Sequence, residues 1–357
     1  MSVTRVTRQG NLGTRNLVIN GAMNISQRGQ NTAIATGFDS TTNTYGPDRF
    51  LMSGYGSPQN RGDVEHVSSG GPTGFPSFFR YDITTAESAV AAGEATLMQH
   101  RIEGYLVNEL SWGNAAAKPV TLSFYMRSPK SGTHCVALGQ SGGRHQIKEF
   151  TVSSADTWEN HSVTFSADTS GSMNATTSEG LRIIWPIICG STYQASADTW
   201  AGATDFATSN QQNLADNTSN NIDLTGVQLE VGPVASDFVH EDYATTFNKC
   251  LRYFEYQPYV VNTFVAIGFS NTTTSHQCTL QFTEKRASGP TIAVSTAAQW
   301  EVNRQGTDQT CSSLSGSSAS RVGMTFIGIV SSGLPVGEAA AIRSNNSGNY
   351  VSISSEL

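Results

Sequence analysis

Apolar and polar residues alternate along several stretches of the chain. The clearest is 120–127, where four apolar residues alternate with Thr, Ser, Tyr and Arg. This alternation places the apolar side chains on one face of a β-strand. The stretches 79–83 and 181–187 repeat the pattern. Pro186 has no N–H group, so it predicts either an edge strand or a break in the ladder.

The alternation changes phase between residues 222 and 231. Ile222 and Leu224 occupy one parity, whereas Val227 and Leu229 occupy the other. A slip of one residue would turn every later side chain to the opposite face of the sheet. Because a bulge absorbs such a slip, we predict a β-bulge at Gly226.

Helical periodicity occurs in one segment. Asp242 is a suitable N-cap, and apolar residues recur at helical spacing over 243–256 before Pro258. We therefore predict a linking helix over 243–257. The strands on either side are joined by loops rich in Gly, Ser, Asn and Asp, which is typical of sandwiches and jelly rolls. The predicted fold class is all-β, with a jelly-roll sandwich over 16–242 and a smaller C-terminal β-sandwich over 258–357.

Composition supports this class and restricts the function. Charged residues make up 14% of the chain, well below the roughly 25% of ordinary domains, which argues against an extensively helical protein. The 21 Lys and Arg against 28 Asp and Glu give a net charge of −7, which disfavours nucleic-acid binding. The chain has no run of 18 apolar residues and no apolar leader, so we expect a soluble protein without membrane insertion.

Cysteines, histidines and motifs give little sign of metal or catalytic chemistry. The five cysteines are odd in number and widely spread, with no CxxC pair, so we expect neither a zinc site nor disulfides, as in a protein made in a reducing cytosol. The seven histidines are scattered. Nucleophile-elbow, HExxH and phosphate-loop patterns are absent from the sequence. We expect no cofactor, no metal and no enzyme, although a glycan-cleaving carboxylate pair would leave no sequence pattern.

Several strings, taken in order over about 340 residues, resemble a widespread group of bacteriophage tail-fibre and receptor-binding virion proteins. The strings are NLVINGAMNISQRG at 16–29, YGPDRF at 45–50, KPVTLSFYMRS at 118–128, TWENHSVTF at 157–165, STYQASADTW at 191–200, LTGVQLEVGPVASDFVHEDY at 224–243, NKCLRYFEYQ at 248–257 and VSISSEL at the C-terminus. The first two are similar to the start of the jelly-roll region in that group. The strings at 224–257 are similar to its final strand and the helix that follows.

The resemblance implies a component of the phage tail in the virion, made in the cytoplasm of the host bacterium. It further implies a homotrimer that adheres non-covalently to a host surface polysaccharide or outer-membrane component. Residues 1–15 would be an N-terminal attachment segment that binds other phage tail proteins. Two alternatives remain: a purely architectural tail, baseplate or collar protein, and a glycan depolymerase.

Sugar binding requires an exposed aromatic face and a few amide or carboxylate partners. Trp200, with Tyr193 and Asp198 in the loop STYQASADTWAG, is the first candidate for such a site. The alternative is that Trp200 closes the end of the sandwich.

A second candidate set lies in the C-terminal domain, in the polar stretch AAQWEVNRQGTDQT. Trp300, Gln299, Asn303 and Asp308 could form an exposed tip there. The alternative is that Trp300 packs against a neighbouring subunit or under its own loop.

Apolar and aromatic residues of the predicted linking helix are candidates for the oligomer interface. A helix face that one chain leaves unburied could pack around a threefold axis. The candidates are Phe247, Leu251, Tyr253, Phe254 and Tyr256.

Overall fold

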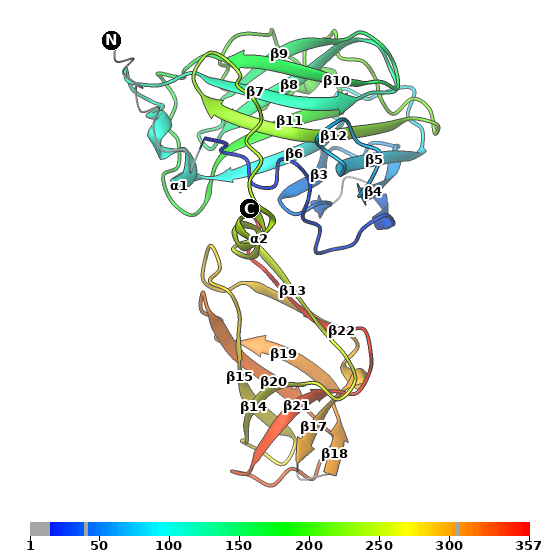
Figure 1. Ribbon diagram of the computed structural model, residues 1–357, viewed down its shortest axis with the longest axis vertical. Coiled ribbons are helices and arrows are strands. Elements are labelled where there is room, and N and C mark those ends of the chain that lie inside the picture. Colours follow the sequence, from blue (N-terminus) through cyan, green and yellow to red (C-terminus); the bar gives the residue numbers. More distant parts are fainter. Residues whose placement is uncertain (1–14, 39–41, 305–306) are drawn as a thin grey trace, which may run out of the picture. The chain divides into compact units, whose positions relative to one another are not determined.

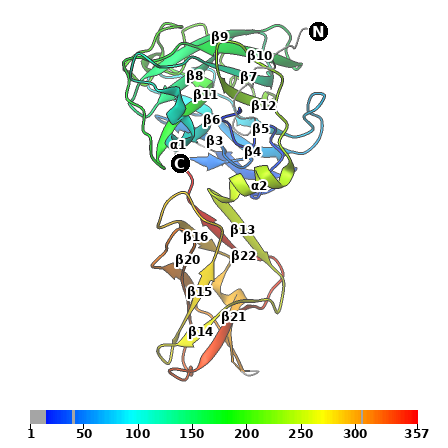
Figure 2. The ribbon, with the colours of Figure 1, turned by 60° about the vertical axis from the view of Figure 1, so that its left-hand side comes forward.

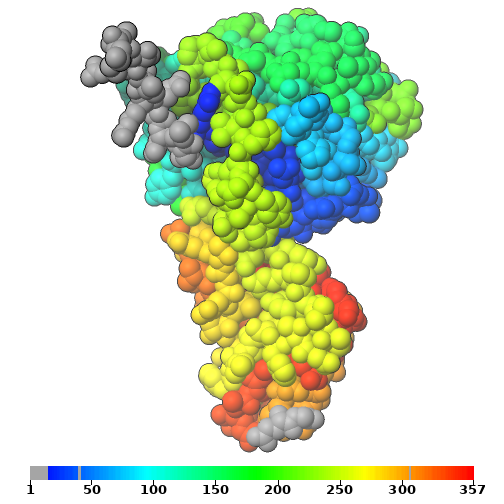
Figure 3. Space-filling view, in the orientation of Figure 1, coloured from blue at the N-terminus to red at the C-terminus, as the bar shows by residue number. Residues whose placement is uncertain are grey.

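The structure is a computed structural model that describes residues 15–38, 42–304 and 307–357. The chain divides into two compact units: unit 1 ends at Thr246 and also takes in Leu357, and unit 2 is Phe247–Glu356. The colours in Figure 3 follow this division, from blue to green in unit 1 and from yellow to red in unit 2. Of the predicted attachment segment 1–15, all but Arg15 lies outside the described residues.

Unit 1 is a sandwich of two six-stranded antiparallel sheets (Figure 1). Sheet A has the order β1 (Ala33–Phe38), β4 (Arg61–Val67), β5 (Phe78–Thr85), β12 (Asn221–Val231), β7 (Val120–Arg127) and β10 (Trp158–Phe165). Sheet B has the order β2 (Thr44–Tyr45), β3 (Phe50–Tyr55), β6 (Ala95–Glu103), β11 (Glu179–Cys189), β8 (Gly132–Gln140) and β9 (His145–Val152). The short helices are α1 (Gly104–Val107), η1 (Asn108–Leu110) and η2 (Ser191–Tyr193).

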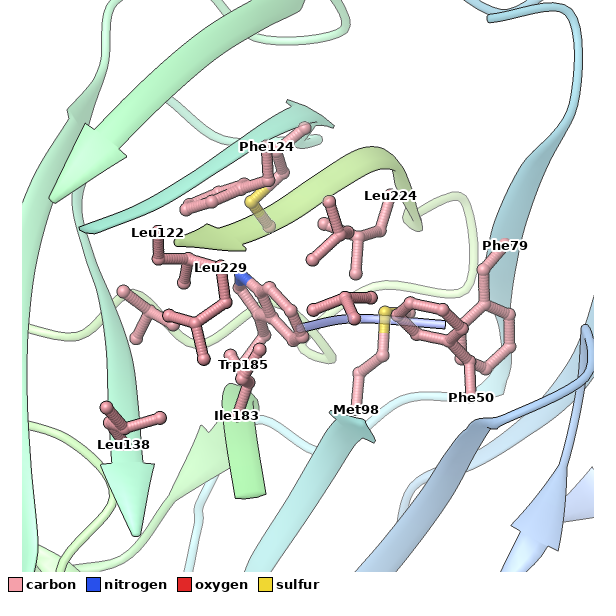
Figure 4. Packing of buried hydrophobic residues seen from close by; sticks show 14 of the residues in the cluster. Phe50, Phe79, Met98, Leu122, Phe124, Leu138, Ile183, Trp185, Leu224 and Leu229 are labelled. Carbon is pink, nitrogen blue, oxygen red and sulfur yellow. The ribbon is translucent and has the colours of Figure 1, made fainter. Parts of the chain in front are cut away.

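The main core of unit 1 lies between the two sheets. Figure 4 shows side chains of β7 and β12 meeting those of β6 and β11. At the centre, the rings of Phe124 and Trp185 meet edge to face with centroids 5.6 Å apart. Both residues belong to alternating stretches whose apolar side chains point into the core, as the sequence predicted. The all-β class and the sandwich architecture are therefore confirmed.

The predicted bulge is present in β12. Pairing passes from Thr225 opposite Tyr125 to Gln228 opposite Ser123, so β12 holds one extra residue. Gly226 lies at this point with φ of 60°. A residue with a side chain is strained at this left-handed φ, whereas glycine adopts it freely, which explains the glycine at this position.

The segment that precedes β1 fills the gap beside the bulge. The side-chain oxygen of Asn16 accepts hydrogen bonds from the N–H groups of Val18 (3.0 Å) and Leu229 (3.1 Å). The Asn16 amide donates to the carbonyl of Val227 at 3.1 Å. The string NLVING therefore has a structural role, because it pairs with backbone groups of β12 that lie beyond the end of the β5 ladder at Leu224.

Replacing Gly226 with Ala is expected to lower the free energy of unfolding of unit 1 by about 1–3 kcal/mol, because a non-glycine residue is strained at positive φ. The added Cβ would also lie 2.9 Å from the Tyr125 ring. Urea denaturation measures the change. Gly202→Ala is the control, since its Cβ would have nothing within 4 Å. Equal stabilities of the two variants would contradict the prediction.

Pro186 lies at a break in a ladder and not on an edge. β11 is an internal strand between β6 and β8, so the edge-strand alternative is wrong. Pairing with β8 ends at Ile184, and the pairing with β6 shifts register between Pro186 and Ile188. The missing N–H of Pro186 is thus accommodated where the ladder is already interrupted.

Unit 2 is a smaller sandwich of a three-stranded and a seven-stranded antiparallel sheet. The first has the order β13 (Phe254–Tyr259), β22 (Asn349–Ser354) and β16 (Thr291–Val294). The second has the order β18 (Thr307–Thr310), β17 (Trp300–Arg304), β21 (Ala339–Ser344), β14 (Phe264–Ser270), β15 (Ser275–Gln281), β20 (Gly323–Ile329) and β19 (Ser313–Ser317). A 3-10 helix, η3 (Ala297–Gln299), precedes β17.

The predicted helix exists but is shorter than predicted. Asp242 caps it, since its carboxylate accepts a hydrogen bond from the N–H of Thr245 at 2.9 Å. Helix α2 spans Tyr243–Leu251, so the predicted end at 257 is wrong. Phe254 instead begins β13, which runs beside β22 in Figure 2. The backbone N–H and C=O groups from Phe254 onward pair with β22, so they are not available for the hydrogen bonds of a longer helix.

Two of the interface candidates are buried within the chain. Tyr253 and Phe254 are 0% and 8% exposed, so they are not available to a partner subunit, and their assignment to an interface is wrong. The side chains of Phe247 and Leu251 are half-buried. Tyr256 is more exposed, and its ring stacks on Tyr350 with centroids 5.2 Å apart.

All five cysteines are free thiols with buried side chains. Cys135 and Cys189 belong to unit 1, and Cys250, Cys278 and Cys311 to unit 2. Burial raises the pKa of Cys189, Cys278 and Cys311 to about 12. A thiol that stays protonated and covered is a poor nucleophile.

Candidate functional site

The loop that follows β11 lies against the outer face of sheet B. Tyr193 anchors it, with its ring centroid 5.1 Å from that of Tyr55 and 5.4 Å from that of Phe206. Backbone hydrogen bonds also join the two ends of the loop, from Ala195 N–H to Ala207 (3.0 Å) and from Phe206 N–H to Tyr193 (2.8 Å). Segments 191–197 and 205–210 are thereby fixed next to each other. Tyr193, a predicted ligand residue, thus packs between the loop and sheet B.

A pocket of about 540 Å³ opens at this loop. Its lining comes from the two loop segments and from one strand residue: Glu149, Ser191, Gln194, Ala195, Ser196, Ala197, Thr208, Ser209 and Asn210. The lining thus offers hydroxyl, amide and carboxylate groups and no aromatic ring. Such groups suit a ligand that is itself rich in hydroxyls.

Glu149 connects the strand to the loop. It lies on the exposed side of β9, and one carboxylate oxygen, Oε1, accepts hydrogen bonds from the Thr208 hydroxyl and from the Asn210 amide, the latter at 3.0 Å. The turn at 208–210 is therefore held by Glu149. Glu149 was not predictable from the sequence, since a single glutamate at an outward position of a strand has no distinguishing pattern.

Asp198 lies beside the pocket and does not line it. Its carboxylate forms an ion pair with Lys148, and its N–H donates to the carbonyl of Ile147 at 2.9 Å. Both contacts tie the loop to β9. Asp198 thus positions the pocket wall, which is a different role from the direct ligand contact that the sequence suggested.

Trp200 occupies the end of the sandwich. Its ring meets that of Trp112 edge to face with centroids 5.0 Å apart, and it packs against the main core. The indole N–H donates to the carbonyl of Ser166 at 2.9 Å. These contacts favour the alternative in which Trp200 closes the sandwich.

Replacing Trp200 with Ala is therefore expected to destabilise unit 1 by about 2–3 kcal/mol, somewhat less than the truncation of a fully buried tryptophan costs. The reason is the loss of its packing against Trp112 and of its hydrogen bond to Ser166. Thermal unfolding measures the effect. An unchanged melting temperature, combined with lost ligand binding, would instead identify Trp200 as a ligand platform.

The C-terminal candidates do not form one exposed tip. Trp300 is fully buried in the core of unit 2, and its indole N–H donates to the Ser295 hydroxyl at 3.0 Å. Its assignment to ligand binding is wrong, because Trp300 and Val302 form the inward parity of β17. The packing of Trp300 within its own chain agrees with the alternative interpretation.

The other three C-terminal candidates hold local structure. The Gln299 carbonyl accepts a hydrogen bond from the Asn349 amide at 2.6 Å. Asn303 and Asp308 face each other across the β17–β18 pair and are hydrogen bonded. Asn303 also lines a smaller pocket of about 320 Å³ with Phe264 and Ile267, two residues that leave an apolar patch exposed on β14.

In the described part of the chain, no three His, Cys, Asp or Glu side chains gather as a metal-binding group. Among those same residues, every helix is too short or too polar to cross a membrane.

Among known proteins, this chain is similar only to solved structures. No family model matches the chain, and no curated protein matches it. The enzymatically active domain of tailspike protein 4 from bacteriophage CBA120 is 8% identical, with a TM-score of 0.29, over 51% of this chain and 19% of the tailspike chain. The chain thus spans about a fifth of that protein.

Two carbohydrate-binding domains give similar scores. The family 11 carbohydrate-binding module of Clostridium thermocellum, in complex with a mixed-linked tetrasaccharide, is 10% identical over 56% of this chain and 97% of the module, with a TM-score of 0.30. The N-terminal cellulose-binding domain of Cellulomonas fimi β-1,4-glucanase C is 11% identical over 57% and 99%, with a TM-score of 0.30. Scores of this size do not define a shared fold, so the architecture stands on the strand order described above.

Proposed function

We propose that this chain is a non-catalytic attachment protein of a bacteriophage tail, and that unit 1 binds a glycan of the host surface through the pocket between segments 191–197 and 208–210. The polar pocket carries this proposal. Its hydroxyl, amide and carboxylate groups match the hydroxyls of a sugar, and the strand and loop contacts hold them in place. The tail assignment draws its support from the strings that resemble phage fibre proteins.

In this proposal the protein works as a homotrimer within the virion. A shallow pocket that binds one sugar residue is weak by itself, and three linked copies raise the overall affinity by orders of magnitude. Residues 1–15 would join the trimer to other tail proteins.

Binding to host cells tests the proposal. Fluorescently labelled full-length protein is expected to stain susceptible bacteria and to compete with phage adsorption. Ser196→Trp places an indole ring in the pocket and is expected to abolish staining, whereas Ser69→Trp, at an exposed position outside the pocket lining, leaves it intact.

Other results would support different functions. Absence of staining by the unmodified protein would favour a purely architectural tail protein. Release of reducing ends from host polysaccharide would reveal a depolymerase. Normal staining by Ser196→Trp would place attachment elsewhere on the chain.

A further inference from the structure

We propose that the pocket of unit 1 selects a sugar residue without acidic groups, and that Glu149 makes this selection. The inference rests on the proposed function, since it names the class of glycan that the same pocket takes. Among the residues that line the pocket, Glu149 alone carries a charge. The pocket lining therefore carries a formal charge of −1.

The carboxylate of Glu149 has one oxygen to offer to a ligand. Its Oε1 is engaged by Thr208 and Asn210. Its Oε2 accepts no hydrogen bond from the residues that the structure describes. An ionised carboxylate only accepts hydrogen bonds. A ligand at Oε2 must therefore bring a donor, either a hydroxyl or a protonated amine.

The cation that precedes Glu149 in the sequence does not offset its charge. Lys148 precedes Glu149 on β9, but its ammonium group is paired with Asp198 at the edge of the loop. The pair contributes little net field, so Glu149 remains uncompensated at the pocket. A uronate or phosphate group in the pocket would be repelled, because like charges a few ångströms apart repel each other. The net charge of −7 acts in the same direction.

The experiment compares three tetrasaccharides by titration calorimetry: tetraglucosamine, tetra-N-acetylglucosamine and tetragalacturonate. The full-length protein is expected to bind the first two at least about tenfold more tightly than the third, which corresponds to about 1.4 kcal/mol. The preference for tetraglucosamine is expected to weaken as salt is added, because the charges are near the surface.

Substitutions separate the charge of Glu149 from its structural role. Glu149→Gln keeps the carbonyl oxygen that Thr208 and Asn210 need, so the loop is retained while the charge is lost. The preference for tetraglucosamine over tetragalacturonate is expected to shrink at least about fivefold. Glu109→Gln removes an exposed carboxylate outside the pocket lining and is expected to keep the preference of the unmodified protein.

The outcomes distinguish this inference from the function that underlies it. Equal or tighter binding of tetragalacturonate overturns the inference and leaves glycan attachment standing. An unchanged preference in Glu149→Gln overturns the role of Glu149. Cell staining without binding to any of the three tetrasaccharides also overturns the selectivity. Failure of the unmodified protein to stain cells overturns the proposed function itself.

Discussion

Replacing Glu255 with Gln is expected to lower the free energy of unfolding of unit 2 by about 3–5 kcal/mol, the usual cost of removing one partner from a buried ion pair. Lys285 has a side chain that is 0% exposed, and its ammonium lies 2.7 Å from the carboxylate of Glu255. Burial lowers the pKa of Lys285, while Glu255 raises it. Without the carboxylate of Glu255, the buried ammonium must either stay charged with the Leu251 carbonyl as a neutral partner or lose its proton, and both cost free energy.

The neighbouring pair supplies the control for this prediction. Glu284 is 58% exposed on its side chain and pairs with Arg321 at the surface, so Glu284→Gln is expected to cost less than about 1 kcal/mol. Urea denaturation of both variants measures the difference. A double variant, Glu255→Gln with Lys285→Met, is expected to recover much of the loss because no unpaired charge remains. Equal effects of Glu255→Gln and Glu284→Gln would refute the argument.

Mild acid is expected to destabilise unit 1 through two buried histidines. Burial, together with the nearby charge of Arg49, lowers the pKa of His100 to about 3. Burial, with a smaller contribution from Arg182, lowers the pKa of His145 to about 4. In the unfolded chain both side chains have a pKa near 6.5.

The direction of the effect follows from proton uptake. Below pH 6.5 these two histidines bind protons in the unfolded chain but stay neutral in the folded chain, so the free energy of unfolding decreases as the pH falls. The full stability is present above pH 6.5, and the loss continues down to the folded pKa values near 3 and 4. At pH 5 each histidine is expected to cost about 2 kcal/mol.

Urea denaturation of unit 1 between pH 7 and pH 5 measures this loss. The double variant His100→Gln with His145→Gln removes these two groups, so its stability is expected to fall less steeply over the same range, while His66, His134 and His161, whose pKa burial also lowers, remain. The comparison uses the slope against pH, which is independent of any constant cost of the substitutions. A slope that is unchanged in the double variant would assign the acid sensitivity to other groups.

The strands and the bulge were predictable because their signals are local. Alternation over 120–127 fixes which side chains turn inward, and the phase change around Gly226 permits one simple repair. The end of the helix was not predictable in this way. Phe254 falls at helical spacing after Cys250, but its backbone pairs with β22, which lies about a hundred residues later in the sequence. Such distant pairing overrides a short local pattern.

The candidate site was predictable only in part. The loop composition around Tyr193 and Asp198 marked the correct region, but the pocket lining also needs Glu149 from β9 and Thr208 and Asn210 from farther along the chain. Trp300 was misplaced because its polar neighbours were given more weight than its alternation with Val302.

The five buried thiols provide a way to follow each unit of the chain separately. Two lie in unit 1 and three in unit 2, and all are covered in the folded state. A thiol-specific label should therefore attach only when a unit opens, and mass spectrometry of the labelled peptides would report the opening rate of each. Because the five cysteines form no disulfide in the folded state, the labelling needs no reductant to release the thiols beforehand.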